Sequence, residues 1–281
     1  MKKFLSVLMA GAMLFGVLTL AGCGDTTTDT GEDTTTTEDT TTTAEFTTVT
    51  EGVLTMSTNA AFPPYEMTDD SGNIVGIDAE IAAAIAEKLG LELQIDDMDF
   101  DGALAAPQSG KSDIVMAGVT VNEERQLVLD FTETYANGVQ KVIVAEGSDI
   151  TMENLGEQQI GTQKGTTGNI LTTDEFGEDH VIAYDDAIAA VQALNNGQID
   201  CVVIDSAVAD NLVEANPGLT TLDTDYANEE YAIGVAKGNT ALLDAINTAL
   251  QELIDDGTVQ SIIDKYIPTD GTAADEAGTT D

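Results

Sequence analysis

Apolar residues recur in short blocks along the chain, and their spacing alternates between the two-residue period of strands and the 3.6-residue period of helices. In the first part of the chain this pattern predicts strand, helix, strand, helix and strand over residues 52–57, 78–89, 91–95, 102–106 and 113–117. The first helix is the best defined, because Ile81, Ile85 and Leu89 fall on one face and Gly90 stands just past its end. Strands that alternate with helices indicate an α/β fold with a mainly parallel sheet covered on both faces.

The second part of the chain echoes the first. The segment SGKSDIV at 109–115 is similar to NGQIDCV at 196–202, and each is expected to end a helix and open an apolar strand. Two similar α/β lobes are therefore predicted. Two further helical patterns, at 242–253 and 259–266, are separated by an Asp-Gly pair at 256–257. If these helices pack back on the first lobe, the chain crosses between the lobes twice.

The N-terminus has the pattern of an export signal. A Lys-Lys pair and an apolar run end in LAGC at 20–23. This segment resembles the lipobox of bacterial lipoproteins, so residues 1–22 are predicted to be a signal peptide and Cys23 the lipid-bearing residue. The alternatives are an uncleaved anchor helix or an incidental cysteine. Residues 23–50, rich in Thr, Asp and Glu, are predicted to form a disordered tether, and residues 269–281 a disordered tail.

The charge balance narrows the range of partners. The chain has 51 acidic and 9 basic residues, a formal net charge of −42, which excludes nucleic acid as a partner. Anionic lipid repels such a domain as well, so the lipid on Cys23 is the expected attachment to the membrane. The other cysteine, Cys201, lies in an apolar run and is predicted to be a buried, unreactive side chain.

Motifs for catalysis, metal binding and cofactor binding do not occur in the sequence. It has no nucleophile elbow and no paired-His motif, and the residue order of GTQKGTTG at 161–168 differs from that of a phosphate-binding loop. The segment DMDFDG at 97–102 fits the opening of a calcium loop, but Gln108 stands where that loop requires a bidentate Glu. We therefore predict no catalytic residue, no cofactor and no metal.

An ordered set of short motifs carries a resemblance to a known family. The set is AAFPPYE at 60–66, GID at 76–78, SGKSD at 109–113, TVNEER at 120–125, DFTETY at 130–135, QKGTT at 163–167, NGQID at 196–200, ID at 204–205 and YAI at 231–233. In order and spacing it resembles the polar amino-acid-binding proteins of bacterial solute-binding family 3. The resemblance implies a type II periplasmic-binding-protein fold, with two lobes, a two-segment hinge and the ligand cleft between the lobes. Lobe 1 is then expected over residues 51–135 and 231–268, and lobe 2 over residues 136–230.

The binding site that the resemblance implies suits an amino acid, whose carboxylate needs donors and whose ammonium needs an anion. Arg125 matches the family position that holds the carboxylate, aided by Thr120 and by backbone amides near Gly118 and Thr166. Asp205 matches the position that accepts from the ammonium. In the family these two groups come from opposite lobes, so that binding favours closure. The expected ligand-binding residues are Asn59, Phe62, Phe100, Ala117, Gly118, Thr120, Arg125, Gln163, Thr166, Thr167 and Asp205.

Simpler roles remain open for several of these residues. Arg125 has the alternative of a surface salt bridge with a neighbouring glutamate, and Asp205 that of a helix N-cap. Phe62 and Phe100 match aromatic positions that sandwich the ligand side chain, and their alternative is core packing.

Two positions depart from the family pattern. Asn59 stands where many relatives carry an Asp that helps to recognise the distal end of the ligand. This weakens the case for Lys, Arg or His as the ligand and favours a neutral polar amino acid such as glutamine. Pro107 interrupts a helix that relatives usually continue, which puts the last turn of that helix in doubt.

The resemblance implies a monomer, lipid-anchored to the cell membrane and facing its extracellular or periplasmic side. Such a protein binds a polar amino acid by lobe closure and delivers it to the membrane permease of an ABC importer. An enzyme is not expected. The alternatives are a dehydratase of an aromatic-acid precursor on the same fold, and a ligand-sensing surface lipoprotein.

Overall fold

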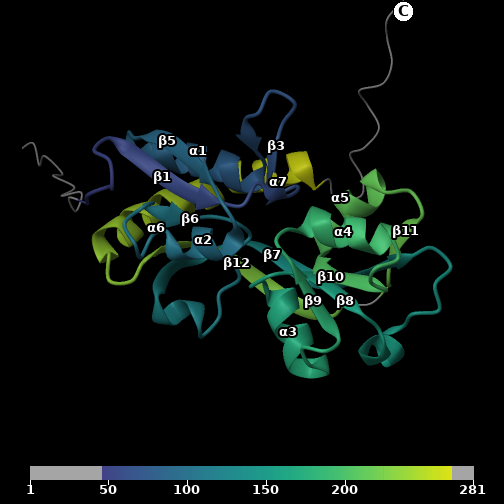
Figure 1. Cartoon of the computed structure of the whole chain (residues 1–281). Coiled ribbons are helices and arrows are strands. Elements are labelled where there is room, and N and C mark those ends of the chain that lie inside the picture. The colour runs from purple at the N-terminus through teal and green to yellow at the C-terminus, as the bar shows by residue number, and fades with distance from the viewer. Residues whose placement is uncertain (1–45, 224, 268–281) are drawn as a thin grey trace, which may run out of the picture. The chain divides into compact units, whose positions relative to one another are not determined.

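A computed structural model describes residues 46–223 and 225–267 of the protein, and a mixed sheet runs through this part of the chain (Figure 1). Its strands lie in the order β5-β1-β6-β12-β7-β10-β8-β9, with β11 paired to β7. They are β1 (Val53–Thr58), β5 (Glu92–Asp97), β6 (Ile114–Val115), β7 (Leu129–Ala145), β8 (Ile160–Gln163), β9 (Val181–Tyr184), β10 (Cys201–Asp205), β11 (Leu219–Thr221) and β12 (Ala227–Ala236). A small second sheet joins β2 (Ala61–Phe62), β3 (Glu66–Thr68) and β4 (Ile74–Val75). The predicted signal peptide, Cys23 and the predicted tail from 269 onward lie outside the described residues.

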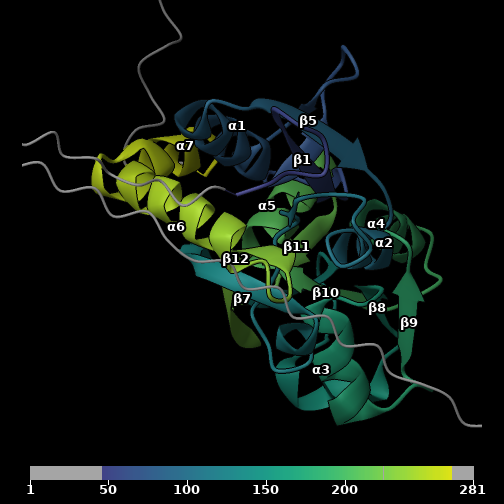
Figure 2. The same ribbon diagram turned by 90° about the vertical axis from the view of Figure 1, so that its left-hand side faces the viewer.

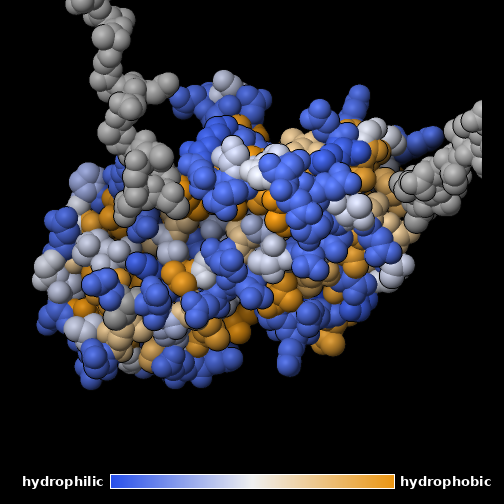
Figure 3. Space-filling view, turned by 180° about the vertical axis from the view of Figure 1, so that it is seen from behind, coloured by the Kyte–Doolittle hydropathy of each residue, from blue (hydrophilic) through white to orange (hydrophobic). Residues whose placement is uncertain are grey.

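Seven α-helices accompany these strands in the described part of the chain. They are α1 (Ile77–Leu89), α2 (Phe100–Ala105), α3 (Thr167–Phe176), α4 (Ala187–Asn195), α5 (Ser206–Ala215), α6 (Thr240–Asp255) and α7 (Thr258–Tyr266), with 3-10 turns η1 (Arg125–Leu127) and η2 (Met152–Glu157). None of the helices described is long and apolar enough to cross a membrane. Figure 3 shows one face of the molecule, where hydrophilic side chains predominate and hydrophobic ones form small, separate areas.

Helix α1 shows how the predicted spacing produces packing. Ile77, Ile81 and Ile85 are fully buried against the sheet, while the opposite face of the helix is exposed. Gly90 takes a left-handed conformation with φ of 70°, and its amide closes the last turn, as Gly commonly does at a helix end. The prediction of a helix ending at Gly90 is therefore confirmed.

The long strands β7 and β12 pass between two groups of elements and form the two-segment hinge (Figure 1). Lobe 1 carries β1, β5 and β6, and lobe 2 carries β8, β9 and β10; within each lobe these strands are paired in parallel. The hinge strands pair antiparallel with each other and with their neighbours in both lobes. The parallel sheet was thus predicted within the lobes, whereas the antiparallel hinge was not.

The C-terminal helices α6 and α7 pack on α1, and Figure 2 shows the three helices together. The C-terminal helices therefore lie with the first helix of the described chain. The break between these helices falls at Gly257, which has a φ of 83°. Helix α2 ends at Ala105, ahead of Pro107, because proline cannot continue the backbone hydrogen bonds of a helix.

Two details at the edges of the fold complete this description. Phe46, within the segment predicted as tether, packs against the lobe 1 core, and the Val49 amide donates to Asp113 at 2.7 Å. Cys201 is fully buried in lobe 2, and burial raises the pKa of its thiol to about 12. The prediction of a buried cysteine is confirmed, and the raised pKa disfavours its reactive thiolate form.

Candidate functional site

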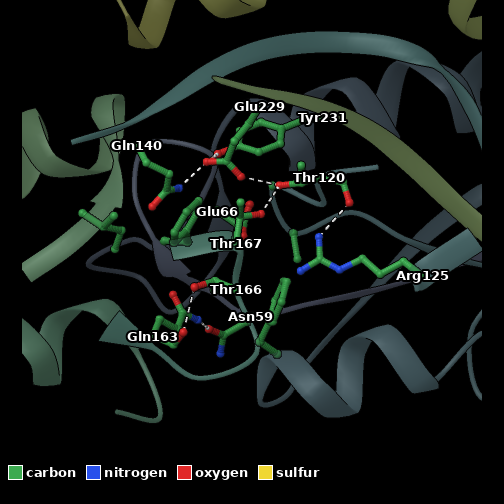
Figure 4. Close-up of a pocket in the computed structure, with 15 residues that line it drawn as sticks. Asn59, Glu66, Thr120, Arg125, Gln140, Gln163, Thr166, Thr167, Glu229 and Tyr231 are labelled. Atoms are coloured by element: carbon green, nitrogen blue, oxygen red, sulfur yellow. Dashed lines mark hydrogen bonds between the residues drawn. The ribbon is translucent and has the colours of Figure 1, made fainter. Parts of the chain in front are cut away.

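A pocket lies where the two lobes meet, next to the hinge (Figure 4). The lining residues are Asn59, Phe62, Glu66, Phe100, Ala117, Gly118, Thr120, Arg125, Gln140, Gln163, Thr166, Thr167, Ile204, Glu229 and Tyr231. All the predicted ligand-binding residues except Asp205 are among them.

Arg125 is buried in this pocket, with 7% of its surface exposed. Its Nη1 donates to the carbonyl of Thr120 at 2.7 Å and its Nη2 to the carbonyl of Gly165 at 3.1 Å. The guanidinium also lies over the ring of Phe100, 5.3 Å from the ring centre. Burial lowers the pKa of Arg125, although Glu229 acts in the opposite direction. Since none of the salt bridges among described residues involves Arg125, a surface ion pair does not explain its position.

The segment 163–167, at the junction of β8 and α3, provides four contacts from lobe 2 to lobe 1. Besides the Arg125–Gly165 bond, they are Gln163 Nε2 to Asn59 Oδ1 at 2.9 Å, Thr167 Oγ1 to Thr120 Oγ1 at 2.8 Å and an ion pair of Lys164 with Asp101 at 2.7 Å. The two lobes are therefore in direct contact across the pocket.

The two aromatic residues of the predicted site lie on the lobe 1 side of the pocket. Phe62 and Phe100 are 7% and 5% exposed and both line the pocket, while Phe62 also belongs to the apolar core. Gly118 makes room for Phe62: its φ is 55°, and a Cβ there would lie 2.9 Å from the Phe62 ring. Any larger residue at 118 would strain the backbone and move the ring.

Asp205 lies beside the pocket, fully buried, and does not line it. Its Oδ1 accepts from the amides of Ala207 and Val208 at 2.9 and 3.2 Å, which makes it the N-cap of α5. Its Oδ2 accepts from the hydroxyl of Tyr231 at 3.0 Å. Burial, and next the nearby Glu229, raise the pKa of Asp205 to about 7. The N-cap alternative is confirmed, and the role of Asp205 in ligand binding stays a prediction.

Five lining residues were not predicted: Glu66, Gln140, Ile204, Glu229 and Tyr231. Three of them belong to motifs that carry the family resemblance, namely Glu66, Ile204 and Tyr231. Gln140 and Glu229 lie on the hinge strands β7 and β12, for which the sequence offered no element.

Glu66 brings a second buried carboxyl group to the pocket. It is fully buried, and neither of its oxygens accepts a hydrogen bond from a donor in the described chain. Burial, followed by its contact with Asp78, raises the pKa of Glu66 well above the ordinary range. A raised pKa favours the protonated form of Glu66, and a protonated carboxyl group can donate a hydrogen bond.

Asp78 connects this carboxyl pair to the backbone of the pocket. Its Oδ2 accepts from the Gly118 amide at 3.0 Å and its Oδ1 from the Tyr135 hydroxyl at 2.8 Å. Burial raises its pKa to about 6, and the hydrogen bonds oppose that rise. Asp78 thus positions the loop at 117–120 that lines the pocket.

Glu229 is 4% exposed and receives donors from three directions. They are the Thr120 hydroxyl, the Gln140 amide and, at 3.4 Å, the Tyr231 hydroxyl. Figure 4 shows Glu229, Gln140 and Tyr231 together on one side of the pocket, with Asn59 and Gln163 on another. Strand β12 therefore places a carboxyl group directly at the pocket.

Buried acceptors without a donor gather at this pocket. In the described part of the chain they include both Glu66 oxygens, Gln140 Oε1 and Gln163 Oε1. A buried acceptor left without a donor is costly. A ligand that carries several N–H groups can satisfy these atoms, whereas one that ends in acceptors cannot.

The acidic run at 97–102 has other roles. Asp97 accepts from the Ala60 amide, Asp99 caps α2, and Asp101 pairs with Lys164. The described residues contain no group of three acidic, His or Cys side chains arranged to hold a metal ion.

Comparisons with known proteins agree on one group. The profile of the bacterial extracellular solute-binding proteins, family 3, matches residues 54–269. A probable histidine-binding protein of Neisseria gonorrhoeae is 29% identical over 282 residues, covering 98% of each chain. An L-cystine-binding protein of Escherichia coli (strain K12) is 30% identical over 225 residues, covering 79% of this chain and 85% of that protein. The solved structure of an ancestral arginine-binding protein bound to glutamine is 38% identical with a TM-score of 0.74, covering 78% of this chain and 100% of the other.

Proposed function

Because the chain belongs to the bacterial extracellular solute-binding proteins, family 3, we propose that its two lobes close on one free amino acid, which it then delivers to the permease of an ABC importer. The family and these relatives are solute-binding proteins and not enzymes, and this chain binds a polar amino acid for transport by an ABC importer. Its fold is the type II periplasmic-binding-protein fold. The lobe boundaries that we propose are 51–135 with 231–268 for lobe 1, and 136–230 for lobe 2.

The observation that carries the proposal is the buried guanidinium of Arg125 in a pocket lined from both lobes. Its planar fork suits a carboxylate, and its position against Thr120 and Gly165 puts it between lobes. The amino group of the ligand is assigned to Asp205, the acidic side chain that β10 of lobe 2 brings next to the pocket. A zwitterion held at both ends ties the lobes together.

The chemical class of the ligand side chain follows from the hydrogen-bond donors that it must supply. Glu66 and Gln163 present three buried oxygens without a donor, and Glu66 gains a partner for its charged form only from a cation. A guanidinium has five N–H groups, whereas an amide has two. Its planar cation also fits between aromatic rings such as Phe62 and Phe100. We therefore assign the ligand to the amino acids with a cationic, donor-rich end, and arginine first.

The neutral ligand predicted from Asn59 remains the competing assignment. Calorimetry with L-arginine and L-glutamine separates the two, because both amino acids present the same α-carboxylate and α-ammonium. We expect L-arginine to bind at least about 10-fold more tightly, the value of one additional charge-assisted hydrogen bond. Tighter binding of L-glutamine would overturn the argument from Glu66 and support the argument from Asn59.

The attachment to the membrane is a further part of the proposal. We propose a monomer whose Cys23 carries lipid, so that the binding domain stays at the outer side of the cell membrane. Cys23→Ser should then release the protein into the wash of isolated membranes and abolish incorporation of labelled fatty acid. Retention of the variant together with an unchanged lipid label would contradict the anchor.

A further inference from the structure

Two buried carboxyl groups meet at the hydroxyl of Tyr231. Asp205 Oδ2 lies 3.0 Å and Glu229 Oε1 3.4 Å from the Tyr231 oxygen. One hydroxyl proton serves only one acceptor fully, so Tyr231 alone cannot serve both acids. Glu229 is also the second cause, after burial, of the raised pKa of Asp205. The two groups therefore repel each other at close range.

The protein supplies little positive charge to offset this pair. Arg125 is the only buried basic residue in the described part of the chain, and its guanidinium bonds go to carbonyls and to neither acid. Buried carboxylates usually have a cationic partner, since an unpaired buried charge is strongly unfavourable. This arrangement suits a cation that comes from the ligand.

An unpartnered side chain marks the place for that cation. Gln140 is 3% exposed and lines the pocket, and its Oε1 has no donor while its Nε2 donates to Glu229. Glu229 itself lines the pocket, whereas Asp205 does not. An alkylammonium group carries three N–H donors, and Glu229, Gln140 and Asp205 together offer acceptors for three.

We propose that Glu229 is a ligand-binding residue which, from hinge strand β12, holds the α-ammonium of the amino acid together with Asp205. The inference rests on the proposed function and adds to it a residue that joins the ligand to the hinge. Glu229 accepts from Thr120 of lobe 1 and from Gln140 of the other hinge strand, so an ammonium bound to Glu229 is linked through that carboxylate to both hinge strands and the lobe 1 loop. The hinge would then respond to the amino group directly.

The test removes the amino group from the ligand and the charge from the residue. Glu229→Gln is titrated calorimetrically with L-arginine and with 5-guanidinopentanoate, which is the same molecule without its amino group. We expect the variant to bind L-arginine about 10- to 100-fold more weakly, as for the loss of a charged hydrogen bond, and 5-guanidinopentanoate within about 3-fold of wild type. Glu230→Gln, an exposed position on the same strand, is the matched control and should change neither affinity.

Each other outcome has a distinct meaning. Equal weakening of both ligands would overturn the proposal, since Glu229 would then support the hinge without meeting the ammonium. If Glu229→Gln does not fold, Glu229→Asp replaces it: a shorter carboxylate should weaken L-arginine selectively, and equal effects on both ligands would again overturn the proposal. Wild-type protein that binds neither L-arginine nor any other free amino acid would refute the proposed function itself, and this inference with it.

Discussion

Arg125 of lobe 1 donates to the backbone carbonyl of Gly165 of lobe 2 across 3.1 Å, from the same guanidinium that we assign to the ligand carboxylate. The only arginine of the chain therefore takes part in closure as well as in binding. A ligand carboxylate on this guanidinium would reinforce a contact between the lobes that is already present, which links affinity to the closed arrangement.

Replacing Arg125 with Ala should nearly abolish ligand binding. The loss should amount to ~2–5 kcal/mol, because the ligand carboxylate is left buried without its charged, bidentate partner. Arg125→Lys keeps a point charge but lacks the planar fork, so its affinity for the ligand should lie between that of wild type and that of Arg125→Ala. Calorimetry with the amino acid that gives the largest thermal shift measures the effect, and wild-type affinity in Arg125→Ala would refute the carboxylate site.

The ion pair of Lys164 with Asp101 should slow the release of the ligand. It spans the lobes at 2.7 Å, and an ion pair of exposed groups is weak because solvent and salt screen it. Lys164→Met should therefore raise the dissociation rate about 2- to 5-fold in stopped-flow measurements at low salt, and less at high salt.

Lys237 provides a matched control for that experiment. It pairs with Asp130 at the same distance of 2.7 Å, but both residues belong to lobe 1. Lys237→Met should leave the dissociation rate unchanged. If the two variants release ligand equally fast, the Lys164–Asp101 pair does not act as a contact between lobes.

Much of the fold could be predicted because its signals are local. Helices α1, α6 and α7 were predicted from their apolar spacing, which a single segment contains. The hinge strands were not, since the residues that pair between β7 and β12 are far apart in the sequence, from Gln140 with Ala227 to Leu129 with Ala236. No turn motif connects them, and only the folded chain brings them together.

The pocket residues that were predicted differ from those that were not in the same respect. Arg125, Gln163 and the other predicted lining residues stand in motifs whose order could be compared with a family. Glu229 had no such signal, because its place at the pocket depends on β12 crossing back between the lobes. Glu66 lay inside a quoted motif, but the burial of a glutamate in a three-residue strand is set by tertiary packing and not by its neighbours in sequence.

The effect of pH on folding stability tests whether the folded protein raises the pKa of Asp205, independently of the role of Asp205 as a helix cap. The folded pKa of about 7 is above that of an unfolded Asp, so the folded protein binds this proton more tightly and loses stability as pH rises from about 4 to 7. Asn is as good an N-cap as Asp. Asp205→Asn should therefore gain roughly 1–3 kcal/mol relative to wild type between pH 5 and pH 8 in the absence of ligand.

Urea unfolding of both proteins at a series of pH values measures this difference, in which the titrations of groups remote from Asp205 cancel. Parallel stability curves would show that Asp205 titrates normally in the folded state. The same variant should bind ligand more weakly than wild type, but less weakly than Arg125→Ala, because the Asn oxygen still accepts a hydrogen bond while the charge is lost.

Glu66 should give up a proton when arginine binds. Burial and Asp78 raise its pKa well above the ordinary range, so we expect Glu66 to carry a proton in the ligand-free protein. A guanidinium at Glu66 favours the charged carboxylate and expels that proton. Binding of L-arginine should therefore release more protons than binding of L-glutamine, and the affinity for L-arginine should rise with pH more steeply, because the α-groups of the two ligands contribute equally.

Calorimetry at pH 7 in buffers of different ionisation enthalpy counts the protons released on binding. In Glu66→Gln the difference between the ligands should vanish and the preference for arginine should fall. An unchanged difference in that variant would place the released proton on another group and remove Glu66 from the recognition of the ligand side chain.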